Sequence, residues 1–356
     1  MVISHSWLAA AAVAALSSTA APPVQAADTP VVWSAAVLAQ AGDWYSSPSA
    51  RRIADNVISH QSREGGWPKN TRLDEPVRAD ADPGLANTFD NQATTLPLAF
   101  LARMTTATGD AAYATAFHRG LDYVLKAQYP NGGWPQYYPL RGGYHDHLTF
   151  NDDAMVRILS LLKDVAAGRQ PYEFVDAAQR ARAALAVERG VDVILKAQVR
   201  QGDRLTVWCA QHDAVTLAPA WARKFEPPSL SGSESVGVVR LLMSLDNPSP
   251  EIIAAVDAAA RWFEASAIRD TRLETYTNAD GQPDRRLTSA AGAPPLWARF
   301  YDLTTNAPIY MGRDSVRHVD LADIERERRM GYAYVGVWPA PLLMEVEAWR
   351  DRRNRR

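Results

Sequence analysis

The feature that most constrains the fold of this chain is an internal repeat of roughly 70 residues. The segment from Gln61 to Pro68 contains Gly-Gly-Trp-Pro, and the same pattern returns between Gln128 and Pro135. The ending Leu-Lys-Ala-Gln of residues 125–128 returns at residues 195–198, and a fainter echo lies at residues 263–266. A period of this length holds two helices and their loops, so we expect stacked helical hairpins that form either an open solenoid or a closed toroid.

Apolar residues recur at helical spacing through most of the chain. Ser47 and Pro48 form a helix-start signal, and Asp110 opens a second apolar stripe. A third stripe runs from Met155 to Leu162, whereas the alternation of apolar and polar residues that is typical of strands is scarce. The sequence therefore predicts an all-α fold whose polar, aromatic-rich loops gather at one end.

Charge and cysteine content exclude several classes of protein. Among 356 residues, 38 Lys and Arg balance 40 Asp and Glu, so the whole-chain charge does not favour a nucleic acid as partner. Cys209 is the single cysteine, which excludes an intrachain disulfide and a cysteine metal cluster. The 11 Trp and 13 Tyr suit either a site for flat, extended ligands or ordinary core packing.

The first residues have the pattern of a secretory signal. An apolar run spans Trp7 to Leu16, and Val24-Gln25-Ala26 offers a small-residue cleavage site, although no Lys or Arg precedes the run. The run is shorter than the ~20 residues that a transmembrane span needs. We predict a signal peptide over residues 1–26 and one catalytic domain over residues 27–356. The mature protein is expected to be a monomer, secreted or periplasmic, with no attachment to a membrane.

Two acidic loops each precede a helical stripe. The first, Asn87–Asn91, contains Asp90, and the second, Thr149–Asp153, contains Asp152, about one repeat further on. Asp and Asn are preferred at helix N-termini, so capping alone would explain each loop. Two such loops at repeat spacing also suit a hard cation that takes oxygen ligands, and both interpretations stay open at this point.

Arginines and aromatic residues are concentrated in the second half of the chain. The stretch from Trp208 to Ser235 includes a Ser-Gly-Ser that lacks the Gly-x-Ser-x-Gly frame of a serine hydrolase. Arg223 lies in this stretch, and Arg299 and Arg313 lie among aromatic residues further on. Arginines bind carboxylates bidentately and rings bind sugar faces, so these positions suit an acidic sugar. For each arginine the alternative is an ordinary salt bridge, such as one between Arg223 and Glu226.

A set of short blocks occurs in one order along the chain. The blocks are Gly-Gly-Trp-Pro at 65–68 and 132–135, Thr-Phe-Asp-Asn at 88–91, Phe-Asn-Asp-Asp at 150–153, Trp-Cys-Ala-Gln-His-Asp at 208–213, Ala-Trp-Ala-Arg at 220–223, Leu-Ser-Gly-Ser-Glu-Ser at 230–235, Arg-Phe-Tyr-Asp at 299–302 and Gly-Arg-Asp at 312–314. This ordered set resembles the catalytic module of the pectate lyases of polysaccharide lyase family 10. The resemblance implies an (α/α)₃ toroid, homogalacturonan (polygalacturonate) as substrate, dependence on Ca²⁺, and an arginine as the base.

The resemblance also assigns roles to single residues. It implies that Arg223 is the catalytic base and that Arg299 and Arg313 bind substrate carboxylates. The rings nearest to Arg299 in the sequence, Trp297 and Tyr301, complete the predicted substrate site. Calcium, brought in with the substrate, would meet oxygen ligands, which the resemblance assigns to Asp90, Asn91, Asp152 and Asp153.

The expected reaction is a β-elimination, in which a base removes the proton alpha to the uronate carboxylate and the oxygen at C4 is expelled. A cation on the carboxylate stabilises the negative charge that develops. Free arginine has a pKa of about 12.5 or more. The base therefore needs an alkaline medium and neighbouring positive charge, such as Lys224, where the family pattern has a small residue. His212 is the competing base, because an ordinary histidine pKa of about 6.5 suits proton transfer.

Two other functions remain open from the sequence. A glycoside hydrolase would use Asp90 and Asp152 as acid and base, and would need neither calcium nor an arginine base. A non-catalytic uronan-binding protein would use the arginines and rings only to hold its ligand. The ultraviolet absorbance of an unsaturated product distinguishes the lyase from both.

Overall fold

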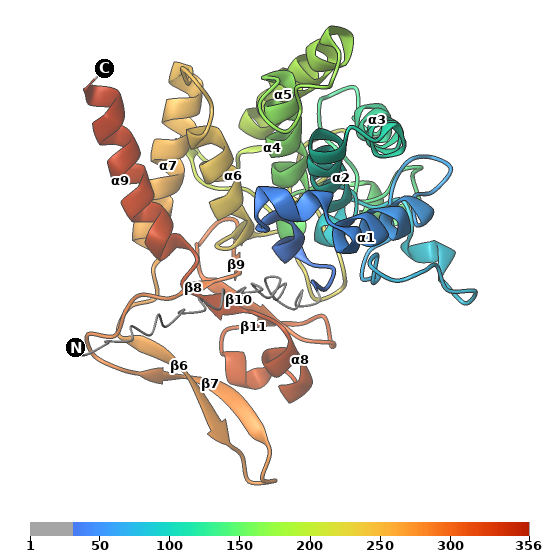
Figure 1. Cartoon of the computed structure of the whole chain (residues 1–356). Helices are drawn as coiled ribbons and strands as arrows, with labels where there is room; N and C mark the ends of the chain where they lie inside the picture. The colour runs from blue at the N-terminus through green and yellow to red at the C-terminus, as the bar shows by residue number, and fades with distance from the viewer. Residues whose placement is uncertain (1–30, 356) are drawn as a thin grey trace, which may run out of the picture. The chain divides into compact units, whose positions relative to one another are not determined.

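Most of the regular secondary structure is helical, and most of the helices pack in consecutive pairs (Figure 1). The helices are α1 (Pro48–Ser59), α2 (Thr95–Thr108), α3 (Ala111–Lys126), α4 (Ala154–Ala166), α5 (Ala177–Ala197), α6 (Glu234–Met243), α7 (Pro250–Ser266), the short α8 (Arg326–Gly331) and α9 (Pro339–Asn354). α2 packs on α3, α4 on α5 and α6 on α7, while α1 lies against the first of these pairs and α9 against the last. The predicted helical hairpins are therefore present.

The computed structural model describes residues 31–355, and one compact unit begins at residue 32. The predicted signal peptide, residues 1–26, lies outside the described residues. Within the described range, none of the helices combines the length and the apolar character that crossing a membrane requires. Short 3₁₀ turns occur at η1 (Ala35–Leu38), η2 (Gly42–Ser46), η3 (Pro83–Leu85), η4 (Asp90–Gln92), η5 (Gly143–Asp146), η6 (Asn151–Asp153) and η7 (Leu321–Asp323).

A glutamine joins each repeated loop to the next helix pair. Gln128 Nε2 donates hydrogen bonds to the Gly132 carbonyl in its own loop and to the Ala186 carbonyl of α5, both at 2.9 Å. Gln61 donates to its own loop and to α3, and Gln198 donates to its own loop and to α7, at 2.9–3.0 Å. The glutamine that recurs in the sequence is thus the residue that fixes each loop against the second helix of the following pair.

A buried tryptophan follows each of these glutamines. The indole N–H groups of Trp67, Trp134 and Trp208 donate to carbonyls near the ends of α1, α3 and α5, at 2.7–2.8 Å. Trp297 makes the same kind of bond to α7, at 2.8 Å. All four side chains are at most 1 % exposed. The structural repeat therefore extends further than the Gly-Gly-Trp-Pro pattern, which is present at only two of the four positions.

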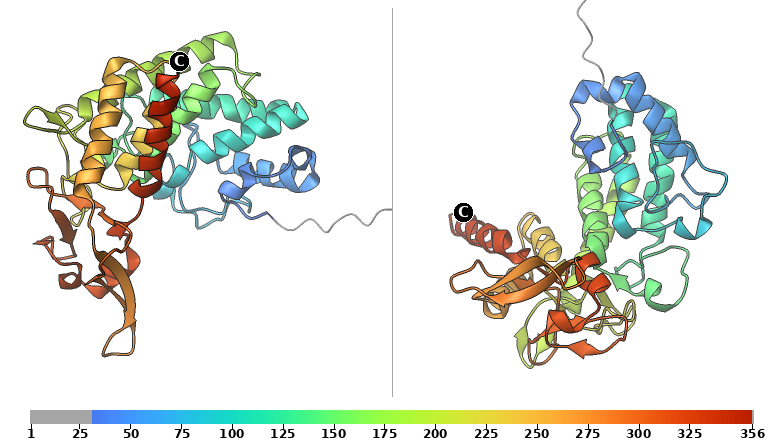
Figure 2. Two further views of the ribbon diagram at one scale, coloured as in Figure 1. Left: turned by 90° about the vertical axis from the view of Figure 1, so that its left-hand side faces the viewer. Right: turned by 90° about the horizontal axis from the view of Figure 1, so that it is seen from below.

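Short strands gather at one end of the helices and overturn the predicted fold class (Figure 2). Four of them form an antiparallel sheet in the order β11-β10-β9-β5, and β6 pairs with β7 in a long hairpin. The strands are β1 (Leu148–Thr149), β2 (Arg200–Gln201), β3 (Arg204–Leu205), β4 (Gln211–His212), β5 (Leu230–Ser231), β6 (Thr271–Thr277), β7 (Pro283–Ser289), β8 (Trp297–Ala298), β9 (Phe300–Tyr301), β10 (Pro308–Met311), β11 (Arg317–His318) and β12 (Val335–Gly336). The predicted all-α (α/α)₃ toroid is therefore wrong.

The strands were not predicted from the sequence, for two physical reasons. Most of them are two residues long, too short to display any alternation. The β6–β7 hairpin is half-buried or exposed along most of its length, so it lacks the apolar face that marks a strand packed on a core. A small hydrophobic cluster nevertheless holds the sheet, and its members include Phe300, Ile309, Tyr310 and Tyr334.

The glutamine bridges give a first testable prediction. Gln128→Leu keeps the size of the side chain but removes both of its hydrogen bonds, each worth about 0.5–1.5 kcal/mol net. We expect the Tm in thermal denaturation to fall by a few degrees. Gln40→Leu is the matched control, because the Gln40 amide bonds only to the exposed Ala36 carbonyl. Equal losses of Tm in the two variants would contradict the bridging role.

Candidate active site

Two equivalent turns carry the acidic residues predicted from the sequence. Asn91 and Gln92 in η4 have φ angles of 49° and 64°. Asp152 and Asp153 in η6 have φ angles of 50° and 59°. Left-handed backbone at residues other than glycine costs on the order of 1–3 kcal/mol each and gathers at functional sites. The two turns contact each other, and each contains two residues in this unfavourable left-handed conformation.

The structural equivalence changes the pairing that the sequence suggested. Phe89 and Phe150, both fully buried, precede the two turns and occupy the same position in each. Counted from these rings, Asp152 corresponds to Asn91, and Asp90 corresponds to Asn151. The prediction had paired Asp90 with Asp152 as equivalent residues. Asp90 and Asp152 therefore come from different positions of the two equivalent turns, the first and the second position after the buried ring.

Asp90 lies at the bottom of the first turn and is held by a lysine that follows the Gly-Gly-Trp-Pro pattern. Lys69 Nζ donates to Asp90 Oδ2 at 2.6 Å and lies 5.5 Å from the centroid of the Tyr137 ring. Burial lowers the pKa of Lys69, but the bonds to Asp90 and Tyr137 outweigh burial and raise it. The second carboxylate oxygen, Asp90 Oδ1, is buried without a hydrogen-bond partner among the described residues.

Asp152 and Asp153 point in different directions. Burial raises the pKa of Asp152, and the charge of Asp90 raises it further against the opposing effect of Arg299. Asp153 instead faces α6, where a Cβ atom built on Gly237 would lie 2.1 Å from Asp153 Oδ1. The structure thus brings Asp90 and Asp152 together with the Asn91 loop, and turns Asp153 away toward the helix.

Arg299 lies at a break between β8 and β9, with its backbone tied on both sides. Its N–H donates to the Tyr334 carbonyl at 2.7 Å, and its own carbonyl accepts from the Gly232 N–H at 3.1 Å. The Nη2 atom pairs with Glu234 Oε1 and lies 3.7 Å from Asp152 Oδ1. The side chain is only 11 % exposed. Arg299 therefore links the sheet, the start of α6 and the second acidic turn.

The Ser-Gly-Ser of the sequence serves to position Glu234. Ser231 Oγ accepts the N–H groups of Ser233 and Glu234, at 3.1 Å and 2.9 Å, and donates to the Glu234 carboxylate. Ser231 thus fixes Glu234, the first residue of α6, from a position two residues before the N-cap Ser233, whose own side chain makes no capping bond. The serine is fully buried, which agrees with the conclusion from the sequence that it is no nucleophile.

Arg223, the predicted base, is held in a fork by Glu226. Its Nε donates to Glu226 Oε2 at 2.8 Å, and its Nη2 donates to Oε1 at 2.5 Å. The Tyr332 hydroxyl donates to the same Oε1 atom at 2.9 Å. The bonds to Glu226 raise the pKa of Arg223, against the opposing effect of burial. The fork occupies one edge of the guanidinium and leaves Nη1 outside it, on a side chain that is 47 % exposed.

Three guanidinium groups surround the ring of Phe225. Their Cζ atoms lie 4.9 Å (Arg223), 5.5 Å (Arg313) and 3.8 Å (Arg328) from the ring centroid. Arg313 is half exposed and forms a fork with Glu327 through Nε and Nη2, at 3.2 Å and 2.8 Å. Arg328 is buried, and two of its nitrogens find no hydrogen-bond partner among the described residues. The predicted base and one predicted carboxylate-binding arginine thus share a ring and lie close together.

The two rings predicted to bind substrate are core residues. Trp297 is 1 % exposed, and its indole N–H bonds to the Phe263 carbonyl. Tyr301 is 0 % exposed, and its hydroxyl donates to the Ser266 carbonyl and accepts the Ala298 N–H, both at 2.9 Å. Neither ring presents a face to a ligand, so the structure does not support the predicted contact of either ring with substrate.

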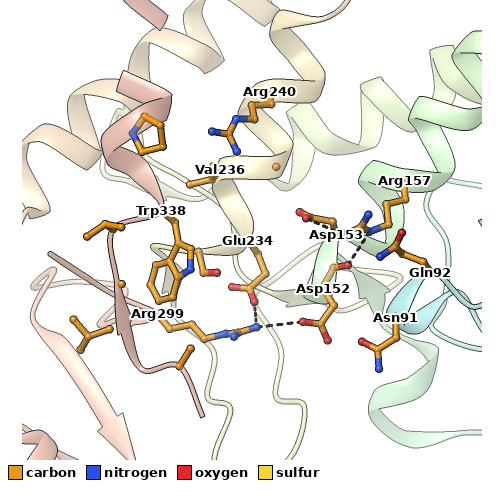
Figure 3. Close-up of a pocket in the computed structure, with 17 residues that line it drawn as sticks. Asn91, Gln92, Asp152, Asp153, Arg157, Glu234, Val236, Arg240, Arg299 and Trp338 are labelled. Carbon is orange, nitrogen blue, oxygen red and sulfur yellow. Dashed lines mark hydrogen bonds and ion pairs between the residues drawn. The ribbon is translucent and has the colours of Figure 1, made fainter. Parts of the chain in front are cut away.

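One cleft of about 830 Å³ is lined by Asn91, Asp152, Asp153, Glu234 and Arg299 among other residues. Figure 3 shows the side chains of Asp152, Glu234 and Arg299 directed toward one another inside it. Arg223 is not among the residues that line this cleft. Tyr332 lies close to both arginines, because its ring centroid is 4.8 Å from the Arg299 Cζ atom and 5.9 Å from the Arg223 Cζ atom. The acidic turn and Arg299 therefore share one cleft, and Tyr332 connects this group to Arg223.

The sequence matches the pectic acid lyase family over residues 61–343. The chain belongs to this family. Two solved structures are similar to it, a family 10 polysaccharide lyase from Cellvibrio cellulosa and a mutant of such an enzyme from the same organism in complex with trigalacturonic acid. Both are 36 % identical to this chain with a TM-score of 0.74. The first comparison covers 86 % of this chain and 95 % of that one, and the second covers 89 % and 99 %.

No match was found among curated proteins. Membership of the family confirms the prediction that this pectic acid lyase is an enzyme that acts on a polysaccharide as a lyase. It also settles the choice between the lyase and the two alternatives, the glycoside hydrolase and the non-catalytic binder.

Sequence analysis missed several residues of this site. Lys69 directly follows the Gly-Gly-Trp-Pro pattern, and that position next to a repeated motif was the available signal. Glu226 was considered only as a default ion-pair partner, although its pairing controls the orientation of Arg223. Glu234 lies in the recurring family block at 230–235 but received no role, and Tyr332 carried no signal of its own because it reaches the site only through the fold.

His212, the competing base, is excluded by its surroundings. The side chain is 0 % exposed, its Nε2 accepts the Cys209 N–H at 3.0 Å, and its Nδ1–H donates to the Leu217 carbonyl at 2.8 Å. Burial lowers the pKa of His212 to about 4. Both ring nitrogens are thus occupied, and the ring stays neutral at neutral pH.

This environment predicts a stability role for His212. An unfolded histidine has a pKa of about 6.5, so the unfolded chain binds the proton more readily. Its contribution to stability is therefore complete above that pH and is lost as the pH falls toward 4. His212→Ala should lower the Tm at pH 8, while the rate of the remaining folded enzyme still rises with pH. A wild-type rate that levels off near neutral pH, and a folded but inactive His212→Ala, would instead assign the base to His212.

Proposed function

We propose that the chain cleaves homogalacturonan by β-elimination, with the neutral guanidine of Arg223 as the base, and releases unsaturated oligogalacturonides. The observation that carries this proposal is the fork between Arg223 and Glu226, because it fixes the guanidine plane and leaves Nη1 free to face a substrate. The trigalacturonic acid in the complex of the similar structure supports an oligogalacturonide as ligand.

Arg299 and Arg313 suit the binding of uronate carboxylates. Arg313 is half exposed, and its fork with Glu327 leaves Nη1 outside, as in Arg223. Arg299 is more buried and lines the cleft, so it would meet a uronate bound inside it. Two fixed cations at different depths determine the register of the chain, which places one sugar at the base.

The reaction follows from these positions. Arg223 Nη1 takes the proton from C5, the electron pair of that C–H bond forms the C4–C5 double bond, and the bond between C4 and its oxygen breaks. The leaving oxygen takes a proton from water. Negative charge develops on the uronate carboxylate during proton removal, and the cation Arg299 stabilises it.

The fork between Arg223 and Glu226 also determines the pH range in which Arg223 can act as a base. Glu226 favours the charged form of Arg223, so only a small neutral fraction exists at neutral pH. Burial of the Arg223 side chain opposes this effect, since burial disfavours the charged form. Lys224 is exposed, and solvent screens its charge. The rate is therefore expected to rise into the alkaline range.

The acidic turns fit a calcium ion. Ca²⁺ takes oxygen ligands, and the Asp90 Oδ1 atom is buried without a partner. Asp90 raises the pKa of Asp152 by charge repulsion, which a cation between the two would relieve. Asp90, Asn91 and Asp152 would hold the ion together with a substrate carboxylate, whereas Asp153 faces α6. A bound calcium ion would neutralise the uronate and make its C5 proton more acidic.

The need for substrate oxygens has a structural basis. No group of three or more His, Cys, Asp or Glu residues that could hold a metal occurs within the described residues. The proposed set contains two carboxylates and one amide, so the remaining positions would come from the substrate and from water. This arrangement agrees with a cation that arrives together with the polyuronate.

We also propose that residues 1–26 direct export and that residues 27–356 form one catalytic domain that acts as a monomer, outside the cytoplasm. The family match begins at residue 61 and ends at residue 343, inside one compact unit, which supports a single domain. A polymeric substrate of this size is encountered outside the cell, which supports export.

The base assignment predicts a large loss of turnover. Arg223→Ala should lower kcat by about 10²- to 10⁴-fold, the range for loss of a general base. Arg223→Lys should also be poor, because an amine does not reproduce the planar fork. The assay is the ultraviolet absorbance of the unsaturated product from polygalacturonate, and Arg261→Gln in a different cavity is the control. Near-normal turnover by Arg223→Ala would refute the assignment.

Glu226→Gln separates the two effects of the fork on Arg223, the orientation of its guanidine and the rise of its pKa. The amide still accepts a bond from Arg223 but removes the negative charge that raises its pKa. The alkaline rise in the rate should therefore shift to lower pH, whereas a purely structural role would lower kcat without moving the pH profile. Product with reducing ends but no ultraviolet absorbance would instead identify a hydrolase.

Calcium dependence gives a separate prediction. Excess chelator should abolish turnover and added Ca²⁺ should restore it. Asp152→Ala should lower activity severely without a loss of Tm, and Asp203→Ala in the β2–β3 turn is the matched control. Because burial raises the pKa of Asp152, activity should fall on the acid side at a higher pH than an ordinary aspartate would give. Full turnover in excess chelator would exclude the calcium site.

A further inference from the structure

The cleft continues beyond the groups used in the proposed reaction. One side of it is lined by Arg240 on α6 and by Trp338 immediately before α9, whereas Arg157 on α4 lies across from Trp338, next to Asp153 (Figure 3). Arg240 and Trp338 take no part in the proposed proton removal or calcium site. The end of the cleft formed by these two residues therefore combines a guanidinium group with an aromatic ring.

Arg240 is held in the same way as Arg223. Its Nε and Nη2 donate to the two carboxylate oxygens of Glu345 on α9, both at 2.7 Å. This fork leaves Nη1 outside, on a side chain that is 44 % exposed and lines the cleft. A guanidinium fixed along one edge presents its other edge to a ligand carboxylate at low entropic cost.

Trp338 is held flat against the backbone. A Cβ atom built on Gly336 would lie 2.6 Å from Cε2 and Cζ2 of the indole and 2.9 Å from Cδ2, so the ring packs directly over that glycine. One face of the ring is thus covered by Gly336, while the half-buried side chain still lines the cleft. Fixed aromatic faces bind the apolar faces of sugars.

The acidic groups at this end each have an arginine nearby. Asp153 lies 3.7 Å from Arg157 and its charge also acts on Arg240, and Glu234 pairs with Arg299. The carboxylate of Glu345 is occupied by Arg240. The free Nη1 edge of Arg240 is therefore the group that remains available for an anion on this side of the cleft.

We propose that this end of the cleft is a further uronate subsite, in which one galacturonate unit stacks on Trp338 and places its carboxylate on Arg240. The inference rests on the proposed function, because it names where a longer chain of the same substrate extends from the reactive centre. The galacturonate unit in this subsite is next to the unit bound at Arg299 or further from it along the oligomer. Oligomers that are too short to reach Arg240 therefore leave the subsite empty.

The test compares oligogalacturonates of different length, from three to six units, with wild type and variants in the ultraviolet assay. Arg240→Gln should lower the ratio of kcat/KM for the hexamer to that for the trimer by about tenfold, as expected for the loss of one charged hydrogen bond. Trp338→Ala should lower the same ratio, and Trp338→Phe should restore part of it because a ring remains.

Glu345→Gln is the matched variant that separates binding from architecture. If Arg240 binds the uronate, removing its competing carboxylate leaves the length ratio unchanged or raises it. If Arg240 serves only as an ion-pair partner for α9, Arg240→Gln and Glu345→Gln give the same change at every length, which overturns the subsite. Failure of the wild type to form any unsaturated product would overturn the proposed function instead.

Discussion

The whole arrangement depends on hydrogen bonds that side chains of the repeated loops make to backbone carbonyls of the helices. A loop that packs between helices must find partners for its polar backbone groups. Gln61, Gln128 and Gln198 each donate to a carbonyl of their own loop and to a carbonyl of the second helix in the following pair. Because Lys69 follows the first of these loops directly, the position of the lysine that holds Asp90 is determined by the same framework. The site is precise because its loops are bonded to helices on both sides.

The acidic turns show what this rigidity allows. Two left-handed residues in each turn, and like charges on Asp90 and Asp152, are unfavourable features that persist only when the surrounding structure fixes them. The buried rings of Phe89 and Phe150, which directly precede the two turns, anchor them in the core. In the proposed reaction, the calcium ion that arrives with the polyuronate would offset the charge repulsion. The site therefore has its least favourable electrostatics in the absence of substrate.

The sequence predicted the helical part of the fold because a repeated glutamine and a helical period are local signals. It did not predict the sheet, since strands of two residues have no period and depend on distant partners. Trp297 and Tyr301 were misassigned for a related reason. In a regular strand they would share one face with Arg299, but the strand breaks at Arg299, which turns outward while both rings stay in the core. Nothing local in the sequence marks that break.

Three arginines are fixed by the same device, a glutamate that bonds Nε and Nη2 of one guanidinium. The pairs are Arg223 with Glu226, Arg240 with Glu345 and Arg313 with Glu327. For a residue that binds a carboxylate, the fork only helps, because it orients the free edge and keeps the charge. For a base, the same fork opposes proton removal by raising the pKa of Arg223. Orientation and basicity thus conflict at one residue, and the partial burial of the Arg223 side chain is the feature that acts in favour of basicity, because burial disfavours the charged form.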